Sequence, residues 1–237
     1  MKTAIVFAAL LPLACQRAAA DTAATAGAPG AAAAVAAQEP VPGAGAPEAP
    51  SAGDDVRVLA PSCSGCVVGQ ILDRAGHPQK DAIVYVKSGP RPAKPAAVRR
   101  PTVVDQRGKA FSPHVLAVEA GSEVVFNNSD LVLHNVYSRS PIKTLDLGTF
   151  GQGQSREMTL QDPGRVDIFC AIHTNMHAII LVLQTPFFAI TDDHGYFEIH
   201  NLPPGPTGMR IWTEHRQEIE VTAEVGPRPA VMRSRLP

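Results

Sequence analysis

Short apolar runs separated by turn residues constrain this chain more than any other feature of its sequence. Gly, Pro and Asn lie between the runs, for example at 120–121, 162–164 and 203–205. Such runs, without a long helical period, indicate β-strands and therefore an all-β sandwich or barrel. For the segment 141–153, a short helix remains an alternative prediction. The predicted strands are 67–72, 82–87, 114–119, 122–128, 155–160, 165–170, 178–184, 196–200, 208–215 and 218–225.

The N-terminus has the pattern of an export signal. Lys2 precedes an apolar stretch at 4–14 that is too short to span a membrane, and the small residues 18–20 fit signal-peptide cleavage. Alternatively, "LPLAC" resembles a lipoprotein box whose lipidated residue would be Cys15. We therefore expect residues 1–20 to be a signal peptide or lipoprotein signal, and the protein to be exported to the periplasm or outer cell envelope.

Residues 21–55 are predicted to be a disordered linker. They are rich in Ala, Pro and Gly and lack the large apolar side chains that a core requires. If Cys15 is lipidated, this linker is a tether, and that anchor is the only membrane attachment we expect. The formal net charge is −1, and no block of Lys and Arg occurs, so we expect no nucleic-acid partner.

Two separated segments resemble the halves of one β-domain, the carboxypeptidase regulatory-like (transthyretin-like) sandwich. In the first, "GQILDRAGHPQKDAIVYVKSG", a strand is followed by Asp73, Gly76 and a second strand, like the family's first hairpin. The second, "ITDDHGYFEIHNLPPGPTGMRIWTEH", resembles the remainder through Gly195 and the Pro204-Gly205 turn.

In that family the two pieces follow each other closely, whereas residues 90–189 separate them here. Insertions succeed at exposed loop tips. We therefore expect one discontinuous domain, 56–89 with 185–226, interrupted by a second domain at 100–184. The alternative is a pair of unrelated small β-units that flank a central domain.

The four cysteines leave one thiol without an obvious partner. Cys15 is either cleaved off or lipidated, and Cys63 and Cys66 lie close together in "CSGC". Two interpretations of this pair are open, a local disulfide and an auxiliary metal site. We favour the disulfide, because no second pair of cysteines follows. Cys170 is then left over, which in an exported protein indicates intermolecular pairing, an inert buried thiol or a metal ligand.

The residues around Cys170 favour a metal. The sequence Cys170-x-x-His173-x-x-Met176 places a thiolate, an imidazole and a thioether in one short loop, and His134 can supply a second imidazole. A His₂Cys set with a weak axial Met is the arrangement of type 1, or blue, copper. His177 is the alternative axial ligand. His114 is expected on a strand as a structural or surface residue.

The segment from about 106 to 184 resembles a cupredoxin of the plastocyanin/amicyanin group. "EAGSEVVFNNSDLVLHNV" is similar to that family's strand pair before its first histidine, and the Cys-x-x-His-x-x-Met loop is like that of amicyanin. The resemblance implies a Greek-key β-sandwich with one type 1 copper held by His134, Cys170, His173 and Met176. It also implies that Asn135 fixes the ligand loop by hydrogen bonds.

Together these patterns predict an extracytoplasmic blue copper protein that carries single electrons between redox partner proteins. We expect an electron carrier rather than an enzyme, since no Ser/His/Asp constellation or phosphate-binding Gly loop occurs. The alternatives are a copper-binding or copper-handling protein without electron transfer, and a structural or interaction β-module on the cell envelope. The regulatory-like domain would serve as a spacer or docking module.

Overall fold

The computed structural model describes residues 63–89, 101–215 and 218–237, which belong to one compact unit of the chain, residues 49–237. The predicted signal, the linker 21–55 and Cys15 lie outside the described residues. Within the described ranges, the chain has no helix with the length and apolar character needed to cross a bilayer.

The described residues form sixteen strands and no helix, which confirms the all-β prediction. The strands are β1 Val67–Leu72, β2 Ile83–Ser88, β3 Thr102–Arg107, β4 Ala110–Ser112, β5 Val115–Glu119, β6 Ser122–Asn128, β7 His134–Ser140, β8 Lys143–Phe150, β9 Ser155–Leu160, β10 Gly164–Phe169, β11 His177–Leu183, β12 Phe188–Ile190, β13 Tyr196–Ile199, β14 Gly205–Trp212, β15 Glu218–Val225 and β16 Ala230–Arg235.

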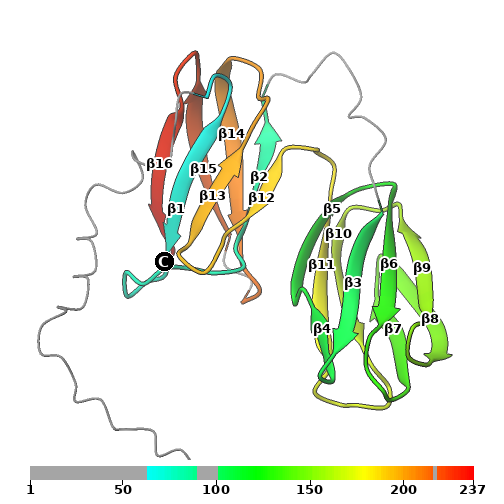
Figure 1. Cartoon of the computed structure of the whole chain (residues 1–237). Coiled ribbons are helices and arrows are strands. Elements are labelled where there is room, and N and C mark those ends of the chain that lie inside the picture. Colours follow the sequence, from blue (N-terminus) through cyan, green and yellow to red (C-terminus); the bar gives the residue numbers. More distant parts are fainter. Residues whose placement is uncertain (1–62, 90–100, 216–217) are drawn as a thin grey trace, which may run out of the picture. The chain divides into compact units, whose positions relative to one another are not determined.

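Strands β3–β11 pair only with one another, and we call them the central lobe (Figure 1). One sheet has the order β5-β11-β10-β7-β8 and the other β4-β3-β6-β9. Along β6, buried Val124, Phe126 and Asn128 alternate with less buried residues, as expected when one face of a strand meets a core. The two inner faces form an apolar cluster that includes Val136, Phe150, Ile168 and Cys170.

Strands β1, β2 and β12–β16 form the other body, which we call the split lobe because its strands come from both sides of β3–β11. One sheet has the order β13-β1-β16 and the other β12-β2-β14-β15. The two strands of the expected first hairpin, β1 and β2, lie in different sheets. β16 lies beyond the predicted limit of 226 and pairs in parallel with β1, with Val67 opposite Ala230. The early and late segments therefore share both sheets.

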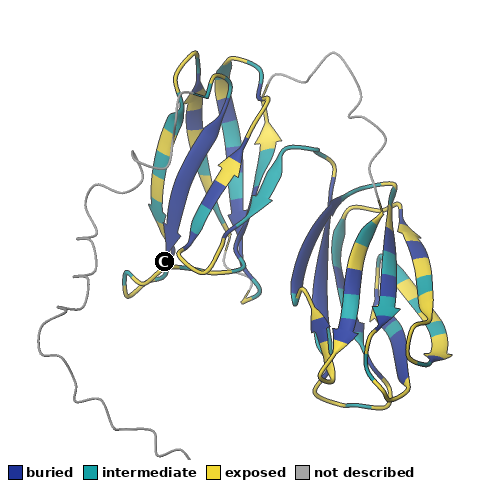
Figure 2. Ribbon diagram, in the orientation of Figure 1, coloured by how far each residue is buried: buried dark blue, intermediate teal, exposed yellow. Residues whose placement is uncertain are grey.

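Several strands were not predicted from the sequence. The segment 141–153, for which a helix was open, instead contains β8, an edge strand of the five-stranded sheet. Its residues alternate between exposed and partly buried positions, as Figure 2 shows for the edge of the central lobe. Strands β3, β4, β7, β12 and β16 were also missed.

β11 is buried on both faces. Ala178, Ile180 and Val182 belong to the central-lobe cluster, while the alternate residues Ile179 and Leu181 belong to a second apolar cluster. This second cluster contains residues of both lobes: Ile83, Val115, Ala117, Ile179, Leu181, Leu183 and Trp212. The continuous apolar sequence of β11 follows from this two-sided burial.

Candidate metal centre

Two loops of the central lobe carry the predicted ligands. His134 is the first residue of β7, after the β6–β7 loop, and Cys170 directly follows β10. His173 and Met176 lie in the loop from β10 to β11, which a hydrogen bond from the Met176 backbone N–H to the His173 carbonyl closes at 3.0 Å. The hydrogen-bonded strands β7 and β10 thus bring the two loops to the same end of one sheet.

The structure brings His134, Cys170 and His173 together. One donor atom from each residue lies within 4.8 Å of the other two. The Cys170 Sγ is 3.9 Å from the Nδ1 of His134 and 3.9 Å from the Nδ1 of His173. His134 and Cys170 are buried, with 0% and 3% of their surface exposed, whereas His173 is partly exposed. The group is therefore a buried thiol and a buried imidazole with one ring that solvent reaches.

Asp130, which the sequence reasoning missed, orients His134. Its Oδ2 lies 2.8 Å from the His134 Nε2. A carboxylate can only accept, so Nε2 carries the proton and the Nδ1 lone pair faces the Cys170 sulfur. A carboxylate behind a histidine is the usual outer partner of a metal-binding imidazole. The spacing of four residues between Asp130 and His134 was the only available signal.

Asp130 also joins the ligand loop to the hairpin between β3 and β4. Gly108 and Lys109, with φ of 62° and 57°, form the two-residue turn, and both donate backbone N–H groups to the carboxylate at 2.6 and 2.8 Å. The N–H of Lys109, then the contact with His134 and the N–H of Gly108, lower the pKa of Asp130 to about 2. The carboxylate is therefore fully charged at neutral pH.

Asn135 connects the two loops that carry the predicted ligands. Its backbone N–H donates to the Cys170 sulfur at 3.4 Å. Its side-chain oxygen accepts the N–H of Ala171 at 3.3 Å, and its side-chain nitrogen donates to Asp146 at 2.7 Å. The backbone N–H holds the Cys170 sulfur, and the side-chain amide fixes the loop that follows Cys170.

The His173 ring is held in the form that can bind a metal. Desolvation lowers its pKa below the ordinary value, and repulsion from nearby positive charge, including that of Lys109, lowers it further. The two histidine ring centroids are 4.9 Å apart. A lowered pKa keeps the imidazole neutral, with a free lone pair, to more acidic pH.

The structure separates Met176 from His177. Met176 is 1% exposed and belongs to the same apolar cluster as Cys170. His177 begins β11 and stacks on Phe169 at 4.8 Å, and its Nε2 lies 2.9 Å from Asp167. The structure therefore does not bring His177, the alternative axial ligand, into the group around Cys170.

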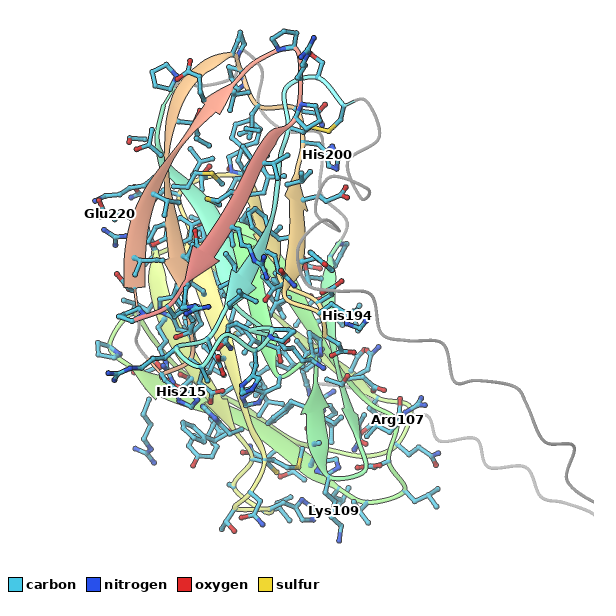
Figure 3. The ribbon with its side chains drawn as sticks, turned by 90° about the vertical axis from the view of Figure 1, so that its left-hand side faces the viewer. Arg107, Lys109, His194, His200, His215 and Glu220 are labelled. Carbon is cyan, nitrogen blue, oxygen red and sulfur yellow. A yellow bond between two sulfur atoms is a disulfide. The ribbon has the colours of Figure 1, made fainter. Side chains whose placement is uncertain are left out.

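The expected bridge between Cys63 and Cys66 is present, with a Cα–Cα distance of 6.0 Å. His200 lies beside it, as Figure 3 shows. One donor atom of His200 is within 4.8 Å of both sulfurs. Because both sulfurs are covalently paired, they offer no thiolate to a metal. Cys170, by contrast, has no disulfide partner among the described residues.

The donors present fit a soft or borderline metal ion. Among the described residues, one thiol and two imidazole nitrogens converge with no carboxylate inside the set, and a thioether side chain is buried in the same cluster. Thiolate and thioether donors select copper, zinc and iron–sulfur groups over hard cations such as magnesium and calcium. The class that the site defines is thus an all-β protein with a candidate metal centre of sulfur and nitrogen donors.

No protein-family model matches the chain, and no curated protein matches it. Among solved structures, an oxidized point mutant of amicyanin is similar at 23% identity and a TM-score of 0.34, covering 35% of this chain and 82% of its own. A purple cupredoxin from Nitrosopumilus maritimus is similar at 19% identity and a TM-score of 0.33, covering 35% of this chain and 99% of its own.

A copper-containing nitrite reductase from Thermus scotoductus is similar at 26% identity and a TM-score of 0.34. This match covers 43% of the present chain but only 25% of the reductase.

Proposed function

We propose that this chain is an exported type 1 copper protein of the cupredoxin kind, which carries single electrons between redox partner proteins. The observation that carries the proposal is the convergence of Cys170 with the Nδ1 atoms of His134 and His173, each 3.9 Å from the sulfur. Met176 is the proposed axial ligand. When bound, copper in a His₂Cys set with a weak axial Met exchanges one electron between Cu(II) and Cu(I).

The protein's contribution is to hold the donors still. Asp130 fixes the tautomer of His134, and Asn135 ties the loop after Cys170 to the opposite loop. Cys170 lies at the end of β10, within the packed interior. Donors that are held by strands and hydrogen bonds need little movement when the charge of the metal changes, which suits an electron carrier better than an enzyme.

The proposed partner surface lies at the end of the central lobe that carries His173, the member of the set that solvent reaches. Leu131 and Leu133, from the loop before His134, are 87% and 57% exposed, and Ile172 is 47% exposed. The loops that carry them are coloured as exposed in Figure 2. Exposed apolar side chains gathered at one place mark surfaces for transient protein partners. The split lobe is proposed to serve as a spacer or docking module of the regulatory-like kind.

Absorption spectroscopy of the copper-loaded protein tests this proposal. We expect an intense thiolate-to-copper band that a mild reductant bleaches and an oxidant restores. Cys170→Ser should abolish the band, while the double variant Cys63→Ser and Cys66→Ser, matched in chemistry, should retain it.

Other results would refute the proposal or redirect it. A protein that stays colourless and binds only Cu(I) would be a copper-handling protein, and a protein that binds no metal at all would be a structural β-module. If the colour survived Cys170→Ser, the ligand assignment would be wrong. Leu131→Asp should leave the band unchanged but slow reduction by a protein partner, which separates the docking surface from the metal site.

A further inference from the structure

A second group of metal-binding side chains lies outside the site around Cys170. His114 precedes β5, His177 begins β11, and Glu214 follows β14. One donor atom from each lies within 4.8 Å of the other two. The shortest contact, between the His114 Nε2 and the Glu214 Oε2, measures 3.0 Å. The proposed copper function uses none of these three residues.

The outer nitrogen of each ring already has an acceptor. The His114 Nδ1 lies 3.0 Å from the backbone carbonyl oxygen of His177. The His177 Nε2 lies 2.9 Å from the Asp167 carboxylate. Because a carbonyl and a carboxylate only accept, both outer nitrogens carry protons. Outer partners of these two kinds are characteristic of histidines that bind a metal through the remaining nitrogen.

The inner nitrogens consequently face the same carboxylate with their lone pairs. The His114 Nε2 faces Glu214 Oε2 at 3.0 Å, and the His177 Nδ1 is 4.0 Å from Glu214 Oε1. At 3.0 Å, the His114 Nε2 and the Glu214 oxygen are two acceptors that need a cation between them, either a metal ion or a further proton on the ring. A proton on His114 would satisfy that contact alone, whereas one metal ion would also use the His177 Nδ1, which at 4.0 Å is too far from the carboxylate for a hydrogen bond.

Two neighbouring residues of opposite charge, Arg165 and Asp167, help to position the members of this group. Arg165 is the nearby cation, and its guanidinium is engaged by both oxygens of Asp167 at 2.7 to 3.1 Å. Its Nη1 also donates to the backbone carbonyl of Glu214 at 2.9 Å, which positions the segment that carries this residue. Asp167 is thus paired on one side with Arg165 and on the other with His177.

We propose that His114, His177 and Glu214 form a second metal site, for a divalent ion of the zinc class. Two imidazoles and one carboxylate are a common zinc set, in which the fourth position belongs to water. The side chains are 41%, 27% and 35% exposed, so solvent reaches that position. The bound ion would link the segment after β14 in the split lobe to two places in the central lobe, the residue before β5 and the start of β11.

Calorimetric titration of the copper-loaded protein with Zn²⁺ tests the site. We expect one equivalent to bind, and His114→Gln and Glu214→Gln each to weaken this binding by more than tenfold. The matched control is His77→Gln, which removes another surface histidine that faces a carboxylate, that of Asp73. Zinc binding to the control should be unchanged.

Thermal unfolding provides a second measurement that also checks folding. Zinc should raise the unfolding midpoint of the wild-type protein and of His77→Gln, but not that of Glu214→Gln. The copper band of Glu214→Gln should be intact, which shows that the variant is folded. If the protein proves not to bind copper, the proposal requires that the wild type bind one more equivalent of zinc than Glu214→Gln.

Two results would overturn the proposal. One is wild-type protein that takes up no zinc beyond that bound by Glu214→Gln. The other is equal zinc affinity in the wild type, His114→Gln and Glu214→Gln. Either would mean that His114 and Glu214 form an ion pair and nothing more.

Discussion

Replacing Asp130 by Asn should destabilise the central lobe, because this carboxylate serves three donors with two oxygens. Gly108 N–H binds Oδ1, while Lys109 N–H and the His134 ring bind Oδ2. An asparagine has a single oxygen. Even in its better orientation, its amide group must face the Gly108 N–H, so that two donors oppose each other, and the remaining bonds lose their charge.

The expected loss can be worked from these contacts. A hydrogen bond to a charged group contributes about 1.5–3 kcal/mol. The bonds from Gly108 and Lys109 lie at the surface, so the lower part of this range applies and the loss should be about 2 kcal/mol. For a protein of this size, each kcal/mol corresponds to about 2–4 °C in the unfolding midpoint. Asp130→Asn should therefore lower the midpoint by about 4–8 °C at neutral pH.

The pKa of Asp130 adds a pH signature. The folded value of about 2 lies below the ordinary 3.8, so the carboxylate contributes stability that is fully present above pH 3.8. This contribution is lost as the pH falls through 2. The difference in unfolding midpoint between wild type and Asp130→Asn should be constant from neutral pH down to about pH 4, and it should become smaller at lower pH.

Circular dichroism melts of the metal-free proteins, recorded across this pH range, measure both effects. Asp162→Asn is the matched control, since Asp162 is exposed in a turn, and should change stability by less than about 0.5 kcal/mol. Equal midpoints for wild type and Asp130→Asn at neutral pH, or a difference that persists at pH 2, would refute the reasoning.

Two further predictions concern the ligand loop and a turn. Asn135→Ala removes the side chain that joins the two loops. Loss of such an outer partner of a metal ligand should lower copper affinity by about 10-fold or more. An unchanged affinity in a competition with a chelator would contradict this prediction. Gly195 and Gly153 share a φ of 73°, but a Cβ on Gly195 would lie 2.4 Å from a backbone oxygen of β1, whereas one on Gly153 meets nothing within 4 Å. Gly153→Ala should therefore lower the free energy of unfolding by about 1–2 kcal/mol, from backbone strain alone. Gly195→Ala should lower it by about 1–3 kcal/mol more, because the added Cβ overpacks the site. Equal losses of unfolding free energy in urea would contradict this expectation, since they would mean that the structure relieves the contact.

The sequence predicted strands well where alternation is strong. The runs 155–160 and 218–225 coincide with β9 and β15, because their apolar residues recur at every second position. β8 was missed because Asp146 and Gly148, both disfavoured in strands, lie inside an edge strand that tolerates them. The pairing of β1 with β16 was missed because pairing between distant segments leaves no local signal.

Residue type and spacing were enough to select the candidate ligands, but not to find the strand pairing and the residues that hold them in place. His134 and Cys170 are separated by 35 residues, and only the strand pairing of β7 with β10 brings them together. Asp130 looked like an ordinary loop acid, since its role depends on a hairpin more than twenty residues earlier in the chain. The His114–His177–Glu214 group was invisible for the same reason, because Glu214 follows a strand of a different lobe.

The two-sided burial of β11 restricts how this protein can evolve. Met176, just before β11, and His177, its first residue, face different groups of side chains. The alternation continues along the strand, so that Ile180 and Ile179 belong to two separate apolar clusters. A deletion or insertion of one residue in the preceding loop that slid the strand by one position would exchange every side chain between the two faces. Saturation mutagenesis should therefore find that this loop tolerates many substitutions at its exposed positions but very few changes in length.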